Sequence, residues 1–200
     1  MFVFETHIDG LVWLQPDVYG DERGYFLESY SRRRLEAFGI DCEFVQDSAS
    51  FSRRGTLRGL HFQKGKDAQA KLVRCVAGTI LDVALDIRSG SPTFGKAFTV
   101  TLSGENNQQL FLPAGFAHGF LTLSETAHVA YKTDAYYAPQ SEGAIDALDP
   151  ELALADAFKE ALGCGDPERF LRSAKDLCAP SWQGYCRSPA FVFKKEPPCC

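Results

Sequence analysis

The sequence predicts an all-β fold, a β-sandwich or barrel with a few peripheral helices that lie mainly toward the C-terminus. Short segments of β-type composition recur along the chain, and Gly, Pro, Asn or Asp residues separate them. Helical periodicity is scarce before about residue 150. Phe is the dominant aromatic residue, with 16 copies against a single Met, and aromatic side chains suit a pleated, half-buried surface.

Each expected strand is a short run that turn residues bound on both sides. The runs lie at residues 12–14, 25–30, 72–76, 79–87, 97–102, 109–112, 120–123 and 128–133. Two of the turns between them look like hairpins. Ala77-Gly78 would pair the third run with the fourth, and the loop 103–107 would pair the fifth with the sixth. Even spacing of short strands is typical of a sandwich or barrel.

Two segments carry the start and stop signals of helices. Residues 31–38 begin at Ser31, a favourable N-cap residue, and stop at Gly39. Residues 151–162 follow an Asp-Pro pair, are rich in Ala, Leu, Glu and Lys, and end at a glycine. Both segments are short, so the helices are expected at the periphery of the β core.

Length and charge limit the organisation and the partners of the chain. Its 200 residues (22.1 kDa) suit a single domain, with a β core at about 10–145 and a helical C-terminal segment and tail at about 149–200. The net charge of −5 and the pI of about 5.4 argue against a nucleic-acid partner held by a basic surface. No apolar run approaches the roughly 20 residues of a membrane span, so no membrane partner is expected.

The seven cysteines form neither a C-x-x-C pair nor a zinc-finger pattern. An odd number of cysteines without regular spacing is not a disulfide framework. We therefore expect a reducing, cytoplasmic compartment for this protein.

Two of the four histidines stand in unusual settings. His61 follows Arg58 closely and precedes Lys71 by ten residues, and glycines flank His118 and permit close backbone approach. A β-sandwich interior that gathers two histidines, a lysine and an arginine is a binding pocket, because such groups are rarely buried without partners.

The spacing around these histidines resembles the two cupin motifs of a jelly roll. The first motif reads G-x5-H-x-Q and the second P-x-G-x2-H. Metal-binding cupins carry H-x-H and a downstream Glu, whereas here Gln63 replaces the second histidine and Asp67 stands at the position of the acid. Two histidines and one carboxylate could still form a facial iron site. A metal-dependent oxygenase therefore stays open as an alternative, although no metal is expected.

A closer resemblance rests on several ordered blocks of sequence. These blocks are Asp21–Glu28, Gln46–Ser50, Arg58–Gln63, Ala68–Arg74, Asp82–Gly95, Pro113–Phe120, Tyr131-Lys132, Tyr136–Pro139, Glu142 and Ser173–Asp176. Together they resemble the dTDP-4-dehydrorhamnose 3,5-epimerase family over about residues 10–150, with Lys175-Asp176 beyond. The resemblance implies a cupin-type jelly roll that inverts carbons 3 and 5 of a nucleotide-linked 4-keto-6-deoxyhexose.

The chemistry implied by this resemblance needs no cofactor. Both carbons flank a ketone, so their protons are acidified by enolate formation, and the enzyme needs a base, an acid and a cation. The resemblance assigns His61 as the base, Asp176 as its ring partner and Tyr131 as the acid on the opposite face. Lys71 would stabilise the enolate oxygen.

The resemblance also implies a nucleotide-sugar site and a homodimer. Arg23, Phe26 and Glu28 match a nucleotide-contact segment that a neighbouring subunit often delivers. Arg58 suits phosphate, and Tyr137 matches a position that stacks on the thymine ring. The remaining positions that match ligand contacts are Gln46, Ser48, Gln69, His118, Glu142 and Lys175.

The chain departs from the family pattern at three places, which leaves the substrate open. Lys64–Asp67 replaces the usual Pro-rich loop after the His-x-Gln motif. Ser48 stands where the family usually has Asn, and residues 152–170 are longer and more helical than usual, so Asp176 is assigned across an insertion. The alternatives are a 3- or 5-epimerase of a dTDP-, CDP- or GDP-linked 4-ketosugar and, from other classes, the metal-dependent oxygenase or a non-catalytic sugar-nucleotide binding protein.

Overall fold

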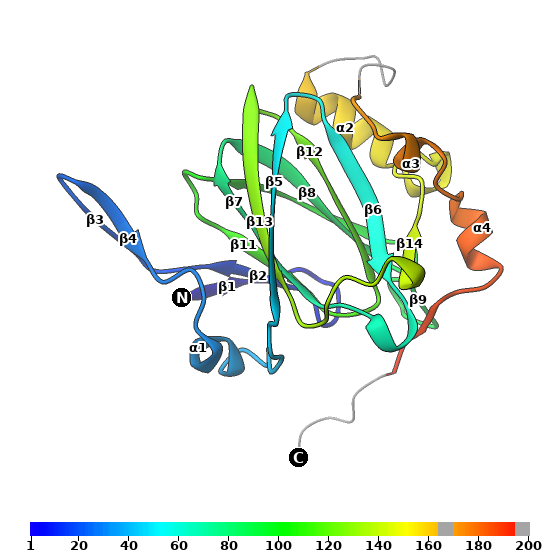
Figure 1. Cartoon of the computed structure of the whole chain (residues 1–200), viewed down its shortest axis with the longest axis horizontal. Helices are drawn as coiled ribbons and strands as arrows, with labels where there is room; N and C mark the ends of the chain where they lie inside the picture. The colour runs from blue at the N-terminus through cyan, green and yellow to red at the C-terminus, as the bar shows by residue number, and fades with distance from the viewer. Residues whose placement is uncertain (164–169, 195–200) are drawn as a thin grey trace.

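The computed structural model describes residues 1–163 and 170–194, and its centre is two antiparallel sheets that face each other (Figure 1). The six-stranded sheet has the order β1 (Phe2–Phe4), β2 (Val12–Gln15), β11 (Gln109–Leu112), β7 (Lys71–Ala77), β13 (Thr126–Thr133), β5 (Gln46–Arg53). The five-stranded sheet has the order β10 (Ala97–Ser103), β8 (Thr79–Asp86), β12 (Phe116–Thr122), β6 (Leu57–Gln63), β14 (Glu142–Ala144). This is the cupin-type jelly roll, so the expected fold class is confirmed.

Two small sheets and a few short helices complete the described structure. β3 (Val18–Asp21) and β4 (Gly24–Leu27) form a hairpin that projects from the body, and β9 (Arg88–Ser89) pairs in parallel with β15 (Phe191–Val192) (Figure 1). The α-helices are α1 (Arg32–Glu36), α2 (Leu154–Leu162), α3 (Ala174–Leu177) and α4 (Trp182–Cys186). Single 3-10 turns occur at Gly65–Asp67, Pro139–Ser141 and Pro150–Leu152. None of the helices in the described residues is long and apolar enough to cross a membrane.

Both predicted hairpins are wrong, because each turn carries the chain from one sheet to the other. β7 and β8 lie in different sheets, and so do β10 and β11. At Gly78 a Cβ atom would lie 2.1 Å from the carbonyl oxygen of Thr126, so only glycine fits against the neighbouring chain. Turn residues specify a reversal of the chain, whereas burial decides which strands pair.

The two predicted helices form with altered bounds. α1 starts after Ser31 and stops before Gly39, whose φ is +79°. The expected helix at 151–162 is interrupted at Ala153, which has a φ of +53°, so that a 3-10 turn precedes α2.

Apolar residues fill the space between the sheets and also the outer side of the five-stranded sheet. Between the sheets, Val73, Ile80 and Leu110 belong to one buried cluster. On the outer side, Val83 and Leu121 pack with Phe158 of α2 and Trp182 of α4. Burying a side chain such as that of Phe158 stabilises the fold by about 1.5–3 kcal/mol. The C-terminal helices therefore cover the back of the five-stranded sheet and leave its inner face to the site. Cys164, Cys199 and Cys200 lie outside the described residues.

Candidate active site

Two adjoining cavities open between the sheets, and the same three predicted residues, His61, Lys71 and Tyr131, border both. The larger cavity has a volume of about 470 Å³. Its further predicted residues are Gln46, Ser48, Gln69, Tyr137 and Glu142. The smaller cavity has a volume of about 190 Å³. Its further residues are Ser50, Arg58, His118, Gly119, Phe120, Ser173 and Asp176.

His61 and Asp176 form a hydrogen-bonded pair although they stand 115 positions apart. His61 Nε2 lies 2.6 Å from Asp176 Oδ1, and only 3% of Asp176 is exposed. Burial lowers the pKa of His61 below 6.5, against the opposing attraction of Asp176. The imidazole is therefore neutral at pH 7, with Nε2–H donated to the carboxylate and the Nδ1 lone pair available as a base.

The first turn of α3 holds Asp176 in this position. The Ser173 hydroxyl accepts a hydrogen bond from the Asp176 backbone N–H at 3.1 Å and donates to Asp176 Oδ2 at 2.8 Å. Arg172 donates to the Asp176 carbonyl oxygen and to Asp146 Oδ1, both at 2.6 Å. Both carboxylate oxygens of Asp176 are thus engaged, which fixes its orientation toward His61.

Lys71 begins β7 and brings a cation beside the base. Burial lowers the pKa of Lys71 to about 8, against the opposing attraction of Asp82 and Glu142. Its Nζ lies 3.4 Å from the His61 carbonyl oxygen. So low a pKa means that nearby negative groups do not offset the burial of the ammonium charge in the free protein. The ammonium group is therefore well placed to stabilise a negative charge that develops on the substrate.

His118 faces the site from the strand beside that of His61. The two histidines are cross-strand partners on β12 and β6, and His118 Nε2 lies 2.8 Å from Asp82 Oδ1. Asp82 is fully buried, and its Oδ2 has no hydrogen-bond partner within the described structure. The sequence reasoning did not single out Asp82. A carboxylate within the apolar run of β8 was the available signal, because such a group needs a partner.

Close backbone approach makes room for this pair of strands. A Cβ atom at Gly59 would lie 2.6 Å from both the Gly119 Cα and the His118 carbonyl oxygen. Glycine at this point therefore lets β6 and β12 carry His61 and His118 side by side.

At the larger cavity a chain of contacts joins the predicted nucleotide-binding residues. The Tyr137 hydroxyl donates to Glu142 Oε2 at 2.9 Å, and Lys175 pairs with Glu142 Oε1. Burial raises the pKa of Glu142, but hydrogen bonds from Lys175 and Tyr137 outweigh it and leave that pKa below its usual value. The Tyr137 backbone N–H donates to Gln46 Oε1 at 3.0 Å, and Gln46 Nε2 donates to Ser48 Oγ at 3.1 Å.

Two further predicted contacts are anchored by neighbouring groups. Arg58 donates through Nε to Ser52 Oγ at 3.0 Å and through Nη2 to the Phe51 carbonyl oxygen at 3.2 Å. Gln69 donates through Nε2 to the Ala135 carbonyl oxygen at 2.7 Å. Arg58 thus lies at the smaller cavity in a fixed orientation.

Arg23, Phe26 and Glu28 do not reach these cavities within one chain. Arg23 and Phe26 belong to the hairpin of β3 and β4, which points away from the sandwich (Figure 1), and 71% of Phe26 is exposed. Arg23 pairs with Asp21 beside it, and Glu28 Oε1 lies 3.5 Å from Arg34 Nη1. Within a single chain these three predicted residues therefore lie away from His61.

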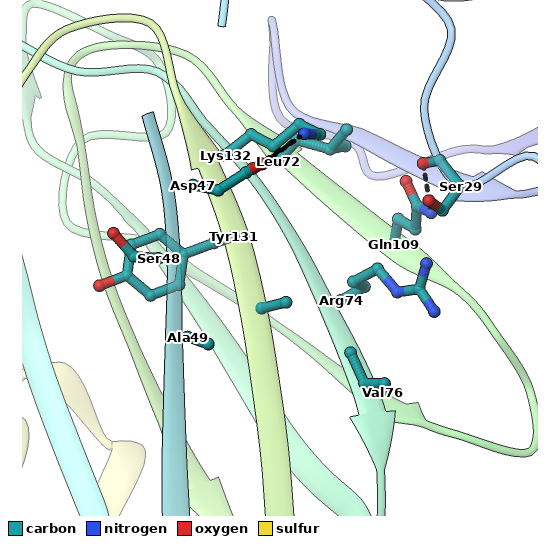
Figure 2. Close-up of a pocket in the computed structure, with 11 residues that line it drawn as sticks. Ser29, Asp47, Ser48, Ala49, Leu72, Arg74, Val76, Gln109, Tyr131 and Lys132 are labelled. Carbon is teal, nitrogen blue, oxygen red and sulfur yellow. Dashed lines mark hydrogen bonds and ion pairs between the residues drawn. The ribbon is translucent and has the colours of Figure 1, made fainter. Parts of the chain in front are cut away.

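A third hollow, of about 450 Å³, lies mostly on the outer face of the six-stranded sheet (Figure 2). Lys132 pairs with Asp47 there at 2.8 Å, and Gln109 donates to the Ser29 carbonyl oxygen at 2.9 Å. Of the predicted residues only Ser48 and Tyr131 border it.

The positions that would supply a cupin metal site serve other contacts. The Gln63 side chain donates to the carbonyl oxygens of Asp67 and Tyr136 and accepts from the Ala138 N–H. The Asp67 carboxylate accepts from Ser141 Oγ at 2.5 Å. Across residues 1–163 and 170–194, no three His, Cys, Asp or Glu side chains cluster as ligands for a metal ion.

Fold and site together define the class of protein: a jelly-roll enzyme whose histidine–carboxylate pair, lysine and tyrosine suit proton transfer at carbon, as in isomerases. Comparison with known proteins gives the family. The family model for dTDP-4-dehydrorhamnose 3,5-epimerase matches residues 5–184. The enzyme of that name from Salmonella typhimurium is 49% identical over 181 residues, covering 90% of this chain and 94% of the relative. The chain belongs to the dTDP-4-dehydrorhamnose 3,5-epimerase family.

Two solved structures illustrate the range of this family. The dTDP-6-deoxy-D-glucose-3,5-epimerase of Legionella pneumophila, in complex with dTDP-4-keto-L-rhamnose, has a TM-score of 0.86 and 44% identity and covers 96% of this chain and 98% of its own. A 3′-monoepimerase from Streptomyces bikiniensis, in complex with dTDP-quinovose, has a TM-score of 0.78 and 34% identity and covers 90% and 87%. Enzymes similar to this chain thus differ in how many carbons they invert.

Proposed function

We propose that this protein inverts carbons 3 and 5 of dTDP-4-keto-6-deoxy-D-glucose to give dTDP-4-keto-L-rhamnose. One observation carries the proposal: His61, Lys71 and Tyr131 border the same two cavities between the sheets, and Asp176 meets His61 at the smaller one. A base, a cation and a weak acid around one ligand-sized space are what the inversion of a carbon beside a ketone requires.

In this mechanism each inversion is one proton removed and one proton returned. His61 Nδ1 takes the proton from carbon 3 or carbon 5, and the electron pair of that C–H bond moves into an enolate whose negative charge lies on the carbon-4 oxygen. The Lys71 ammonium stabilises that oxygen. The Tyr131 hydroxyl then delivers a proton to the opposite face of the carbon. Exchange with solvent through the larger cavity returns His61 to its neutral form and Tyr131 to its protonated form.

Asp176 keeps the base in its working form. It holds the Nε2–H tautomer before the reaction and stabilises the imidazolium after it, because an ionised carboxylate attracts the positive ring. His118, Gln46, Ser48 and Gln69 would contact the ligand from the same cavities.

The nucleotide would occupy the mouth of the larger cavity. Tyr137 stacks on the thymine ring, with its hydroxyl held by Glu142 and Lys175 beyond it. Arg58 supplies a guanidinium for the diphosphate. The protein works as a cytoplasmic homodimer in this proposal, in which the hairpin of β3 and β4 extends to a neighbouring subunit and delivers Arg23, Phe26 and Glu28 to its site.

Proton exchange in heavy water tests the reaction. The protein is incubated with dTDP-4-keto-6-deoxyglucose in D₂O, and the sugar protons are followed by NMR. Deuterium at both carbons 3 and 5 is expected. Deuterium at one carbon only would assign a monofunctional epimerase, the activity named for the Streptomyces bikiniensis relative. The absence of exchange, also with CDP- and GDP-linked ketosugars, would overturn the proposal and favour a sugar-nucleotide binding protein.

Variants then test the roles of the reacting groups. His61→Asn and Tyr131→Phe should each lower exchange about 10²–10⁴-fold, which is the range of general acid–base catalysis. Both should bind dTDP as the parent protein does. Exchange close to that of the parent protein in both variants would remove this mechanism.

A further inference from the structure

Three serines line one face of β5, and only two of their hydroxyl groups have a partner. Ser48, Ser50 and Ser52 alternate with exposed residues along the strand, so their side chains point into the sandwich. Ser48 Oγ accepts a hydrogen bond from Gln46, and Ser52 Oγ accepts one from Arg58. Among the residues that the structure describes, the buried Ser50 Oγ has none.

The fold itself gives no reason for a hydroxyl group at Ser50. The residue lies opposite Val129 in the ladder between β5 and β13, where an alanine would serve equally well. Leaving a buried hydroxyl without a hydrogen bond costs about 1–3 kcal/mol. A group kept at such a cost in the free protein points to a partner that arrives with a ligand.

The position of Ser50 indicates which part of the ligand it meets. Ser50 borders the smaller cavity together with His61, Lys71 and His118, but it does not border the larger cavity where Tyr137 and Glu142 lie. The smaller cavity, of about 190 Å³, thus holds the reacting groups and Arg58, the proposed diphosphate contact, but no nucleotide-stacking ring.

We propose that Ser50 is a substrate-contacting residue whose hydroxyl group hydrogen-bonds to a hydroxyl oxygen of the hexose. The inference rests on the proposed function and names one more residue for the same site. Ser50 would help to fix the sugar ring against His61 and Lys71. Ser48 Oγ also accepts from Gln46 at the larger cavity, whereas Ser52 acts indirectly by holding Arg58. The contact of Ser50 with the hexose strengthens binding of the sugar part of the substrate. It leaves the affinity for dTDP without a sugar unchanged.

The test compares Ser50→Ala with Ser188→Ala, an exposed serine far along the chain that no predicted contact uses. For Ser50→Ala, kcat/KM for the ketosugar should fall about 10- to 100-fold, since a polar group of the substrate loses its partner. The Kd for dTDP should stay within about twofold of that of the parent protein. The melting temperature should not fall, because the variant removes an unsatisfied hydroxyl group and breaks no hydrogen bond. Ser188→Ala should change none of the three.

Each outcome decides the proposal. A Ser50→Ala variant with parent-like kcat/KM would overturn it, and so would a lower melting temperature with a matching loss of dTDP affinity, which would show a structural role. If the parent protein turned over no ketosugar, the proposed function would fail, and binding would still test Ser50. The ratio of the affinity for dTDP-glucose to that for dTDP should then be smaller in Ser50→Ala than in the parent protein. An equal ratio in the variant and the parent protein would refute the inference.

Discussion

Replacing Lys71 by Met should make the protein more stable at neutral pH while it removes most of the activity. Methionine keeps the length of the side chain without the charge. In the folded protein burial lowers the pKa of Lys71 from 10.5 to about 8. Folding therefore weakens proton binding at this site, so the charged lysine lowers stability below pH 8, and stability rises as the pH increases from 8 toward 10.5.

The magnitude follows from the two pKa values. A difference of about 2.5 between 10.5 and about 8, at 1.36 kcal/mol for each pH unit, gives at most about 3 kcal/mol at pH 7. This value already contains the attraction of Lys71 to Asp82 and Glu142, which the substitution also removes. The 3.4 Å contact between Lys71 Nζ and the His61 carbonyl oxygen is long for a hydrogen bond, so its loss changes the expected stability difference little. At pH 9.5 the advantage of the variant should have fallen by about 2 kcal/mol.

Urea unfolding of both proteins at equal concentration, from about pH 7 to pH 9.5, measures the effect. We expect the advantage of Lys71→Met to be largest at pH 7 and to shrink with rising pH, and we expect its exchange rate to fall about 10²–10³-fold because the enolate loses its cation. Lys71→Arg is the matched control, since arginine stays charged throughout this range. A variant that is less stable than the parent at pH 7, or a difference independent of pH, would refute the reasoning.

Three further predictions follow from the same geometry. The pH profile of kcat/KM should be bell-shaped, falling below the lowered pKa of His61 and falling again as the Lys71 ammonium deprotonates near pH 8, and Lys71→Arg should lack the alkaline fall. The Arg23→Ala and His61→Ala variants should each be inactive alone. If the hairpin serves the partner's site, a mixture of the two variants whose subunits have exchanged should regain about a quarter of the parent activity. A mixture that stays inactive argues against a shared site. Tyr137→Ala should weaken dTDP binding by about 1–3 kcal/mol, the value of base stacking, whereas Tyr137→Phe should lose far less; equal losses in calorimetry would contradict stacking.

The sequence predicted strands whose apolar residues alternate or run together, including β7 and β13 of the site, but it missed β5 and β6. The runs at 72–76, 79–87 and 109–112 correspond closely to β7, β8 and β11. β5 was missed because its inward face carries serines, which are typical of loops as much as of strands. Its polar face is the same property that lets it line a ligand cavity. The apolar pattern that predicts a strand is therefore absent where the inward face of the strand lines a substrate cavity.

Residues of the site differ in how far the sequence alone could place them. His61 and Lys71 are ten positions apart on neighbouring parts of the chain, and the structure brings them to one cavity as predicted. Asp82 went unnoticed because only the fold shows that the inner face of β8 meets His118. The placement of Arg23 depends on a second subunit, and no pattern within one chain reveals which site it would serve.

Helix α2 supports the site and lines neither of its two cavities. Along β8 and β12, outward-facing Val83 and Leu121 pack with Phe158 of α2, while inward-facing Asp82 and His118 contact each other between the sheets. α2 therefore buries the back of the strands whose front carries the second histidine–carboxylate pair. Asp176 enters the smaller cavity from α3, beyond α2, where the Ser173 hydroxyl engages its carboxylate. Within residues 1–163 and 170–194, α2 thus supports the site from behind, and the groups that would touch the sugar come from strands and from α3.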